Sequence, residues 1–210
     1  MFVFVGRAIR GRLVRDGEPV SGAVVGVVQV SRDSETFVGE RTAETDASGR
    51  FLLLNLPADE PLVAYAKVDT LAGRGAMAAR EVGDEPDGDV SDLGDLALQD
   101  GVTLSGRVVL ADGKPVPAHA RILVGRERAL DTSEQELASD GSFRFPSLPR
   151  EGVELSIVLR GFALSSKIQG LLPEGWSVRG RTLAGRLEHD TQLNVVLEPV
   201  AMRPPRLPRP

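Results

Sequence analysis

The chain carries one stretch of its sequence twice. "TDASGRFLLLNLP" at residues 45–57 returns in altered form as "SDGSFRFPSLP" at residues 139–149, which places Phe51 92 positions before Phe143. Three further pairs keep the same offset: Leu53 with Phe145, Leu56 with Leu148, and Pro57 with Pro149. A tandem repeat strongly constrains the fold, because both copies must form the same kind of unit.

The repeat extends upstream of these two stretches. "GRLVRDGEPVSGAVV" at residues 11–25 matches "GRVVLADGKPVPAHARIL" at residues 106–123, with one extra residue before the Asp-Gly pair of the second copy. Asp-Gly between two apolar stretches predicts a hairpin turn, because glycine adopts positive φ angles without a Cβ clash. Two further glycine pairs are matched at an offset of 95: Gly6 with Gly101, and Gly11 with Gly106.

Alternation of apolar and polar residues predicts strands in both copies, with one face of each strand toward a core. The alternating residues are Leu62, Ala64, Ala66 and Val68 in the first copy, and Val153, Leu155, Ile157 and Leu159 in the second. We also expect Phe51, Leu53, Phe143 and Phe145 to point inward from equivalent strands. Residues 163–189 are rich in glycine and read as long loops, and no stretch favours a helix.

Composition supports this interpretation. Hydrophobic residues make up 41% of the chain, and 23 glycines and 14 prolines indicate many turns. The predicted fold class is all-β, with two tandem immunoglobulin-like (transthyretin- or prealbumin-like) Greek-key β-sandwiches. The expected domains are residues 1–100 and 101–199, followed by a Pro-rich tail at 200–210 that we expect to be an extended spacer.

Charge and cysteine content exclude several functions. The chain has no cysteine, so disulfides, zinc thiolates and thiol nucleophiles are ruled out. The net charge of −5 comes from one segment, residues 81–100, which holds eight acids and no Lys or Arg. Without a basic face there is little support for nucleic-acid binding. No apolar run reaches the length of a membrane-spanning helix.

The acidic segment is a weak candidate for an irregular calcium site. Its possible ligands are Asp84, Asp87, Asp89 and Asp92. Started at Asp87, an EF-hand loop fails, because Asp92 stands at the glycine position and Leu98 at the position of the bidentate glutamate. The alternative, a solvated acidic loop, is the commoner outcome for such a stretch.

Two aromatic side chains are speculative ligand contacts. Tyr65 and Trp176 could stack on a sugar ring, or Trp176 could simply be buried under a loop. The two histidines, His119 and His189, are too few and too far apart in the sequence to predict a zinc site. No nucleophile elbow or phosphate-binding loop is present. We therefore expect no catalytic site and no cofactor.

The order of these motifs, G-R-x-V-x-D-G-x-P-V-x-G-A-V followed by T-D-x-x-G-x-F-x-L-x-x-L-P, resembles the carboxypeptidase regulatory-like domain. In the first copy the matching residues are Gly11, Asp16, Gly17, Pro19, Gly22, Ala23, Asp46, Gly49, Phe51, Leu53 and Leu56. In the second they are Gly106, Asp112, Gly113, Pro115, Ala118, Asp140, Gly141, Phe143, Phe145 and Leu148. The resemblance implies a transthyretin-like sandwich, grouped with the carbohydrate-binding-like folds. These are turn and core positions, so they indicate a fold and no activity.

Members of that family usually accompany peptidases, outer-membrane receptors or surface proteins as non-catalytic modules. The resemblance therefore implies an extracellular or cell-envelope location and a role as a structural spacer or binding module of a surface or secreted protein. The alternatives are a carbohydrate-binding module and an accessory domain of a peptidase. Expected partners are a glycan or another protein, with no nucleic acid and no membrane insertion.

The register of the repeat also bears on the first five residues. Extended backwards, the offset of 95 sets Phe2 to Val5 opposite residues 97–100, the end of the first unit. Residues 1–5 would then be the remnant of an earlier repeat, and the chain a part of a longer multidomain protein. The alternative is that they extend the first strand, which Phe and Val also favour.

Overall fold

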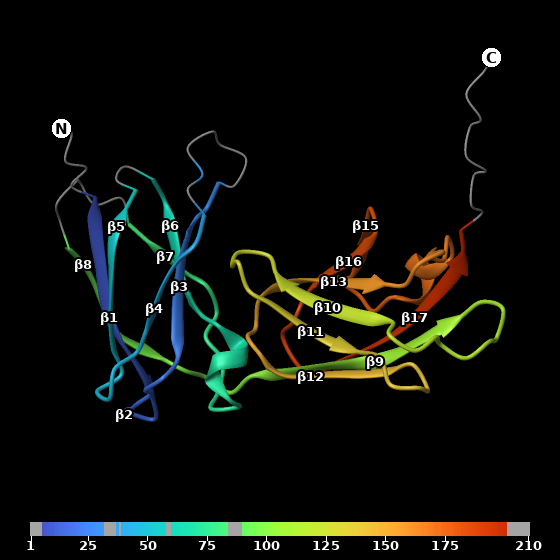
Figure 1. Cartoon of the computed structure of the whole chain (residues 1–210), viewed down its shortest axis with the longest axis horizontal. Coiled ribbons are helices and arrows are strands. Elements are labelled where there is room, and N and C mark those ends of the chain that lie inside the picture. Colours follow the sequence, from blue (N-terminus) through green and yellow to red (C-terminus); the bar gives the residue numbers. More distant parts are fainter. Residues whose placement is uncertain (1–5, 32–36, 38, 58–59, 84–89, 201–210) are drawn as a thin grey trace, which may run out of the picture.

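A computed structural model describes residues 6–31, 37, 39–57, 60–83 and 90–200. They form two β-rich halves that lie next to each other along the long axis, with the first half on the left of Figure 1. The chain passes between them after β8 (Val90–Ala97) and before β9 (Val102–Leu110). Apart from strands, the described residues form only two single-turn 3₁₀-helices, η1 (Val68–Leu71) and η2 (Ile168–Leu171). The all-β prediction is confirmed.

The first half is a β-sandwich of two sheets. In one sheet β1 pairs with β2 and β5 antiparallel and with β8 parallel, and the second sheet has the order β4-β3-β6-β7. The strands not yet given bounds are β1 (Arg7–Arg15), β2 (Glu18–Pro19), β3 (Val24–Gln29), β4 (Arg41–Glu44), β5 (Arg50–Leu56), β6 (Leu62–Ala66) and β7 (Arg80–Val82). Side chains from both sheets, such as Ile9 and Leu53 from one and Val25 and Ala64 from the other, form a single core.

The second half repeats this arrangement with its own core. Its sheets have the orders β12-β9-β17-β14 and β11-β10-β13-β16-β15. The strands are β10 (Arg121–Arg126), β11 (Thr132–Glu136), β12 (Ser142–Leu148), β13 (Gly152–Val158), β14 (Phe162–Leu164), β15 (Ser177–Arg179), β16 (Thr182–Arg186) and β17 (Thr191–Pro199). Leu104, Val124, Leu155 and Leu193 are among the buried residues that both sheets contribute.

The matched phenylalanines occupy equivalent places in the two halves. Phe51 lies opposite Gly11 on the neighbouring strand, and Phe143 lies opposite Gly106 in the same way. A Cβ atom on Gly11 or Gly106 would come within 2.9 or 2.8 Å of the facing ring, so each ring fills the space above its glycine. Both rings are buried, as are Leu53 and Phe145. The predicted core positions are confirmed.

An irregularity in the strands is duplicated as well. The pairing of β5 with β1 shifts register just before Leu56, and the pairing of β12 with β9 shifts just before Leu148. At these two bulges Asn55 and Ser147 both have a φ of 57°. A β-bulge bends its strand and increases the local twist. The two copies therefore share backbone geometry that no side-chain pattern revealed.

The Asp-Gly turns differ between the halves. Asp16 and Gly17 have φ angles of 52° and 85° and form the expected two-residue hairpin between β1 and β2. In the second half the extra residue lengthens the turn, where Gly113 donates its N–H to the carbonyl of Leu110 at 3.0 Å. Residues 114–120 after this turn form no strand equivalent to β2.

Two sequence predictions are wrong. Residues 163–189 are not only long loops, because β15 and β16 lie there and β16 sits within its sheet between β13 and β15. Gly175 and Gly180, with φ angles of 81° and 62°, form the turns around β15 and so separate short strands. Val68, expected on a strand, is the first residue of η1, and Leu159, also expected on a strand, follows the end of β13 at Val158.

Several other predictions are not tested. Residues 1–5 and most of the Pro-rich tail lie outside the described residues. The domain boundaries and the immunoglobulin-like or transthyretin-like topology remain predictions. None of the helices in the described ranges has the length and apolar character needed to cross a membrane.

Replacing Phe143 by Ala should unfold the second half and largely spare the first. Loss of a buried Phe side chain costs about 3–5 kcal/mol, and Phe143 belongs to a core separate from that of the first half. Limited proteolysis with mass spectrometry should show cleavage confined to the region after residue 101. Simultaneous cleavage of both halves would contradict separate cores.

Replacing Gly106 by Ala should destabilise the protein although the added group is a single methyl. Its Cβ would lie 1.9 Å from the carbonyl oxygen of Leu193, so strand β9 or β17 must move. Overpacking of this kind costs about 1–3 kcal/mol in the free energy of unfolding. Gly170 is the matched control, because a Cβ there meets nothing within 4 Å. Urea denaturation should show a loss for Gly106→Ala and little change for Gly170→Ala.

Candidate functional site at the junction of the two halves

The loop between β10 and β11, residues 127–131, covers the outer face of the sheet that contains β3 and β6. All five residues of β6 are buried. Alternate ones face the core of the first half, whereas Val63 and Tyr65 form a separate apolar cluster with Val28 of β3 and Ala129 of the loop. A strand covered on both faces lies between two packed layers, so the halves share a buried contact.

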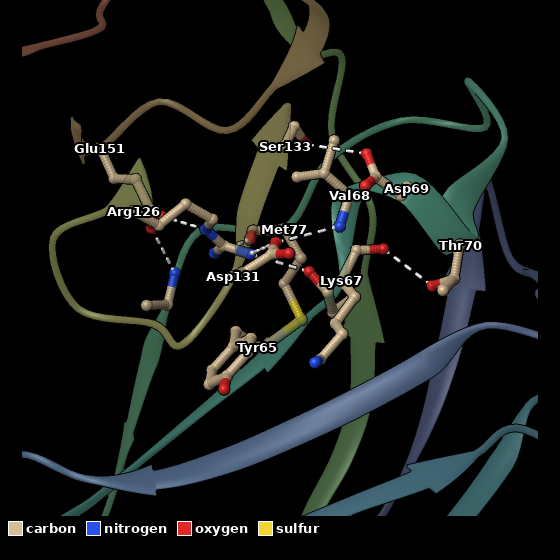
Figure 2. A network of polar contacts seen from close by, with 12 residues as sticks. Tyr65, Lys67, Val68, Asp69, Thr70, Met77, Arg126, Asp131, Ser133 and Glu151 are labelled. Atoms are coloured by element: carbon tan, nitrogen blue, oxygen red, sulfur yellow. Dashed lines mark hydrogen bonds and ion pairs between the residues drawn. The ribbon is translucent and has the colours of Figure 1, made fainter. Parts of the chain in front are cut away.

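Arg126, the last residue of β10, reaches from the second half into the first. Its side chain is 2% exposed. Nη1 donates to the carbonyl oxygen of Ala66 at 2.8 Å. Nη2 donates to that of Met77 at 2.9 Å, and Figure 2 shows Arg126 next to Met77. The guanidinium carbon also lies 5.4 Å from the centre of the Tyr65 ring, within range of a cation–π contact. One cation thus engages the backbone and an aromatic face of the opposite half.

Two carboxylates of the second half also bind the Arg126 guanidinium. Nη1 lies 3.1 Å from Asp131 Oδ2, and Nε donates to Glu151. Each carboxylate also accepts a backbone N–H from the first half: Asp131 from Val68 at 3.1 Å, and Glu151 from Ala79 at 2.7 Å. We call Arg126, Asp131 and Glu151 the junction cluster; donors and acceptors cross the junction in both directions.

Because the junction cluster is buried, each of its charged groups needs a partner within the protein. Asp131 and Glu151 side chains are 6% and 8% exposed, so all three charges are removed from water. Transferring ions into a protein interior costs several kcal/mol each, and the attraction offsets this only when the remaining donors and acceptors are satisfied. One cation faces two carboxylates here, and the N–H groups of Val68 and Ala79 stabilise the excess negative charge.

Polar contacts surround the junction cluster. Ser133 donates to Asp69 of η1 at 2.7 Å, and Arg128 pairs with Glu81 at the edge. Tyr65 donates its hydroxyl to Glu40 at 2.5 Å. Burial, together with that hydrogen bond, raises the pKa of Tyr65 far above its ordinary value, so the phenol remains a protonated donor.

The linker between the halves, residues 98–101, is held by its own hydrogen bonds. Arg15 of the first half donates to the carboxylate of Asp100 at 2.5 Å, and Arg150 of the second donates to the carbonyl oxygen of Asp100 at 2.5 Å. The Arg15 hydrogen bond lowers the pKa of Asp100 below its ordinary value. Asp100 is therefore held by one arginine from each side of the junction.

The two aromatic candidates do not offer a ring face to a sugar. Tyr65 is fully buried beneath Arg126, and Trp176 is 5% exposed. The indole of Trp176 lies so close to β16 that a Cβ on Gly185 would meet it at 2.3 Å. Both side chains pack within the protein, so the expectation that they stack on a ligand is not supported.

The acidic candidates are only partly described. Asp84, Asp87 and Asp89 lie outside the described residues. Asp92 accepts the N–H of Gly94 at 2.9 Å and pairs with Arg10 at 2.8 Å, and these two contacts lower the pKa of Asp92. In the part of the chain that the structure describes, no three His, Cys, Asp or Glu residues gather in a way that could hold a metal.

The two histidines are both on the surface. His119 and His189 are exposed, and the Nδ1 atom of His119 lies 3.4 Å from Glu136. The carboxylate-bearing neighbour Asp190 accepts the N–H of Thr103 at 2.8 Å. These residues are engaged in local contacts on separate parts of the second half.

The junction cluster was missed by sequence reasoning, although the repeat contained a signal. Gln29 ends β3 as Arg126 ends β10, and its side-chain amide donates to Glu60 at 3.0 Å. Glu60 stands 91 positions before Glu151, the offset that relates β6 to β13. A polar pair therefore stands at the same place in both copies, and its first member, Gln29 or Arg126, is buried in each. Comparison of the copies could have found the pair, but not its reach across the junction.

Comparison with known proteins identifies no family for this chain. No protein-family model matches the chain, and no curated protein matches it. Among solved structures, the minor pilin GBS52 of Streptococcus agalactiae is 14% identical, with 98% of this chain and 100% of that chain covered and a TM-score of 0.39. A streptococcal ancillary pilin is 17% identical, with 94% and 63% covered and a TM-score of 0.38.

The Bacillus anthracis TIE protein is also 17% identical, with a TM-score of 0.34. The alignment covers 92% of this chain, which spans only 34% of the length of that protein. Scores and identities this low do not establish a shared family or function.

Replacing Arg126 by Met should strongly destabilise the junction. The change leaves Asp131 and Glu151 buried without their cation, and breaking a buried ion pair costs about 3–5 kcal/mol. Arg121→Met on the same strand is the matched control, because Arg121 forms a half-exposed pair with Glu134 and such pairs contribute only about 0–1 kcal/mol. Denaturation in guanidinium chloride measures both, and equal losses for the two variants would contradict a special role for Arg126.

Proposed function

We propose that the chain is a non-catalytic structural segment of a surface or secreted protein. In this proposal two β-sandwich domains, residues 1–100 and 101–199, act together as a rigid spacer, and residues 200–210 connect it onward. The observation that carries the proposal is the buried junction cluster around Arg126. It joins the halves by directional contacts rather than by a flexible tether.

The contacts at the junction support rigidity. Neighbouring domains usually meet through small polar interfaces and move relative to each other. Here a buried guanidinium reaches two carbonyls of the first half, and two buried carboxylates accept N–H groups from it. Rotation about the linker would leave these buried groups without partners, and each such group is costly. A fixed angle suits a spacer, which must hold its two ends at a set separation.

The family resemblance supports the same interpretation. Carboxypeptidase regulatory-like domains are non-catalytic modules, and their occurrence in surface and secreted proteins favours a location outside the cell or in its envelope. The burial of Tyr65 and Trp176 argues against the carbohydrate-binding alternative, which depended on exposed aromatic rings.

Residual dipolar couplings would test the rigidity of this 22.4 kDa protein in solution. We expect the backbone N–H couplings of both halves to fit one alignment tensor. The variant Arg126→Met should yield two tensors of different magnitude, whereas Arg121→Met should keep one. Two independent tensors in the unaltered protein would overturn the rigid-spacer proposal.

A further inference from the structure

We infer that each half is built to resist tension applied along the chain, so that the spacer bears mechanical load between whatever is attached to its two ends. This inference deepens the proposed function and rests on it. It comes from the way in which the first and last strands of each half are paired.

In both halves the first and last strands are parallel neighbours. β1 pairs with β8 from Ala8 opposite Val90 to Val14 opposite Ala97. β9 pairs with β17 from Leu104 opposite Thr191 to Leu110 opposite Leu197. The chain therefore enters each half at one end of a ladder and leaves at the opposite end.

This arrangement decides how a pulling force acts on the hydrogen bonds. The hydrogen bonds of a parallel ladder run across from strand to strand, evenly spaced and slanted relative to the chain direction. When the entry and exit points lie at opposite ends of one parallel pair, tension slides one strand along the other and loads all the bonds together. When both points lie at the same end, tension opens the bonds one after another. The first geometry needs the larger force.

The second half has the more regular of the two ladders. Its seven residue pairs run without a register shift, and the N–H of Ala111 extends the ladder by donating to the carbonyl of Leu197 at 2.8 Å. The ladder of the first half shifts register between Arg10 and Arg12, where Gly94 has a φ of 63°. The second half is thus the cleaner place to test the inference.

Burial of the last strand resists sliding further. Leu193, Val195 and Leu197 of β17 all point into the core of the second half. Moving β17 along β9 would drag these side chains out of their packing positions. The strand that leaves the second half is therefore held by backbone hydrogen bonds on its edge and by core packing on its face.

A short connecting segment transmits tension from the first half to the second. Only residues 98–101 separate β8 from β9, and they remain tied to the body of the protein. The N–H of Leu98 donates to Val14 at 2.7 Å, and Gln99 forms a β-bridge with Ala76. Asp100 is held by Arg15 and Arg150. Tension leaving the first ladder consequently enters the second within a few residues.

Single-molecule force spectroscopy can compare the two pulling directions within one folded half. Because the chain has no cysteine, introduced cysteines provide unique attachment points. Thr103→Cys with Val200→Cys attaches the handles at opposite ends of the β9–β17 ladder. Thr103→Cys with Gln192→Cys attaches them at the same end and is the matched control. Circular dichroism and thermal unfolding of both variants, before handles are attached, establish that they fold alike.

We expect the Thr103–Val200 attachment to unfold at a force higher by about twofold or more, since its ladder bonds break together rather than in sequence. Equal unfolding forces for the two attachments would overturn the inference. That result would leave the rigid spacer intact, because the orientation of the halves is measured separately by dipolar couplings. Conversely, two alignment tensors together with a high unfolding force for the Thr103–Val200 attachment would contradict the rigid spacer and support the load-bearing ladder.

Discussion

The guanidinium of Arg126 is the group on which the relation between the two halves depends. It lies over the Tyr65 ring, donates to Ala66 and Met77 of the first half, and forms ion pairs with Asp131 and Glu151 of its own half. Each carboxylate in turn accepts an N–H from the first half. Removing the cation would leave two buried negative charges. The junction would then lose stability in its apolar contact as well as in its hydrogen bonds.

Duplication explains why so much of the fold could be predicted from the sequence. Phe51 and Phe143 were identified as equivalent core residues because a core position and its turn recur at a fixed spacing, and both lie over a glycine in the structure. The strands of residues 163–189 were missed because β15 and β16 are short and their turn glycines resemble those of a loop. The backbone bulges at Asn55 and Ser147 were not predicted, because two different residue types adopt the same positive φ there.

The junction could not be predicted for a different reason. The sequence alone offered Tyr65 as a side chain that could stack on a sugar ring, and it gave no reason to single out Arg126. Arg126 and Tyr65 are instead buried, because each covers the other across the junction. Such burial depends on the placement of two separately folded cores, and local patterns carry no information about it.

The two copies have diverged where they meet. Val63 and Tyr65 line the outer face of β6 in the first half, and the corresponding residues of β13 are Glu154 and Ser156. The apolar contact surface is therefore present in the first copy only, while Arg126 replaces the Gln29 of the first copy. Identical copies would each offer the same surface to any other copy, whereas complementary ones meet in a defined order.

The acceptors that Arg126 uses in the first half are backbone carbonyls, and the donors that Asp131 and Glu151 use there are backbone N–H groups. Side chains on the first half can therefore change while these contacts persist, provided that the chain path through Ala66 to Ala79 is kept. The second half has no such freedom, because three of its side chains supply the chemistry. Substitutions at the polar contacts of the junction are thus tolerated better in the first half than in the second. A foreign sandwich grafted in place of the first half would need the same chain path and an apolar outer face like that of Val63 and Tyr65, but none of the charged side chains of the junction cluster.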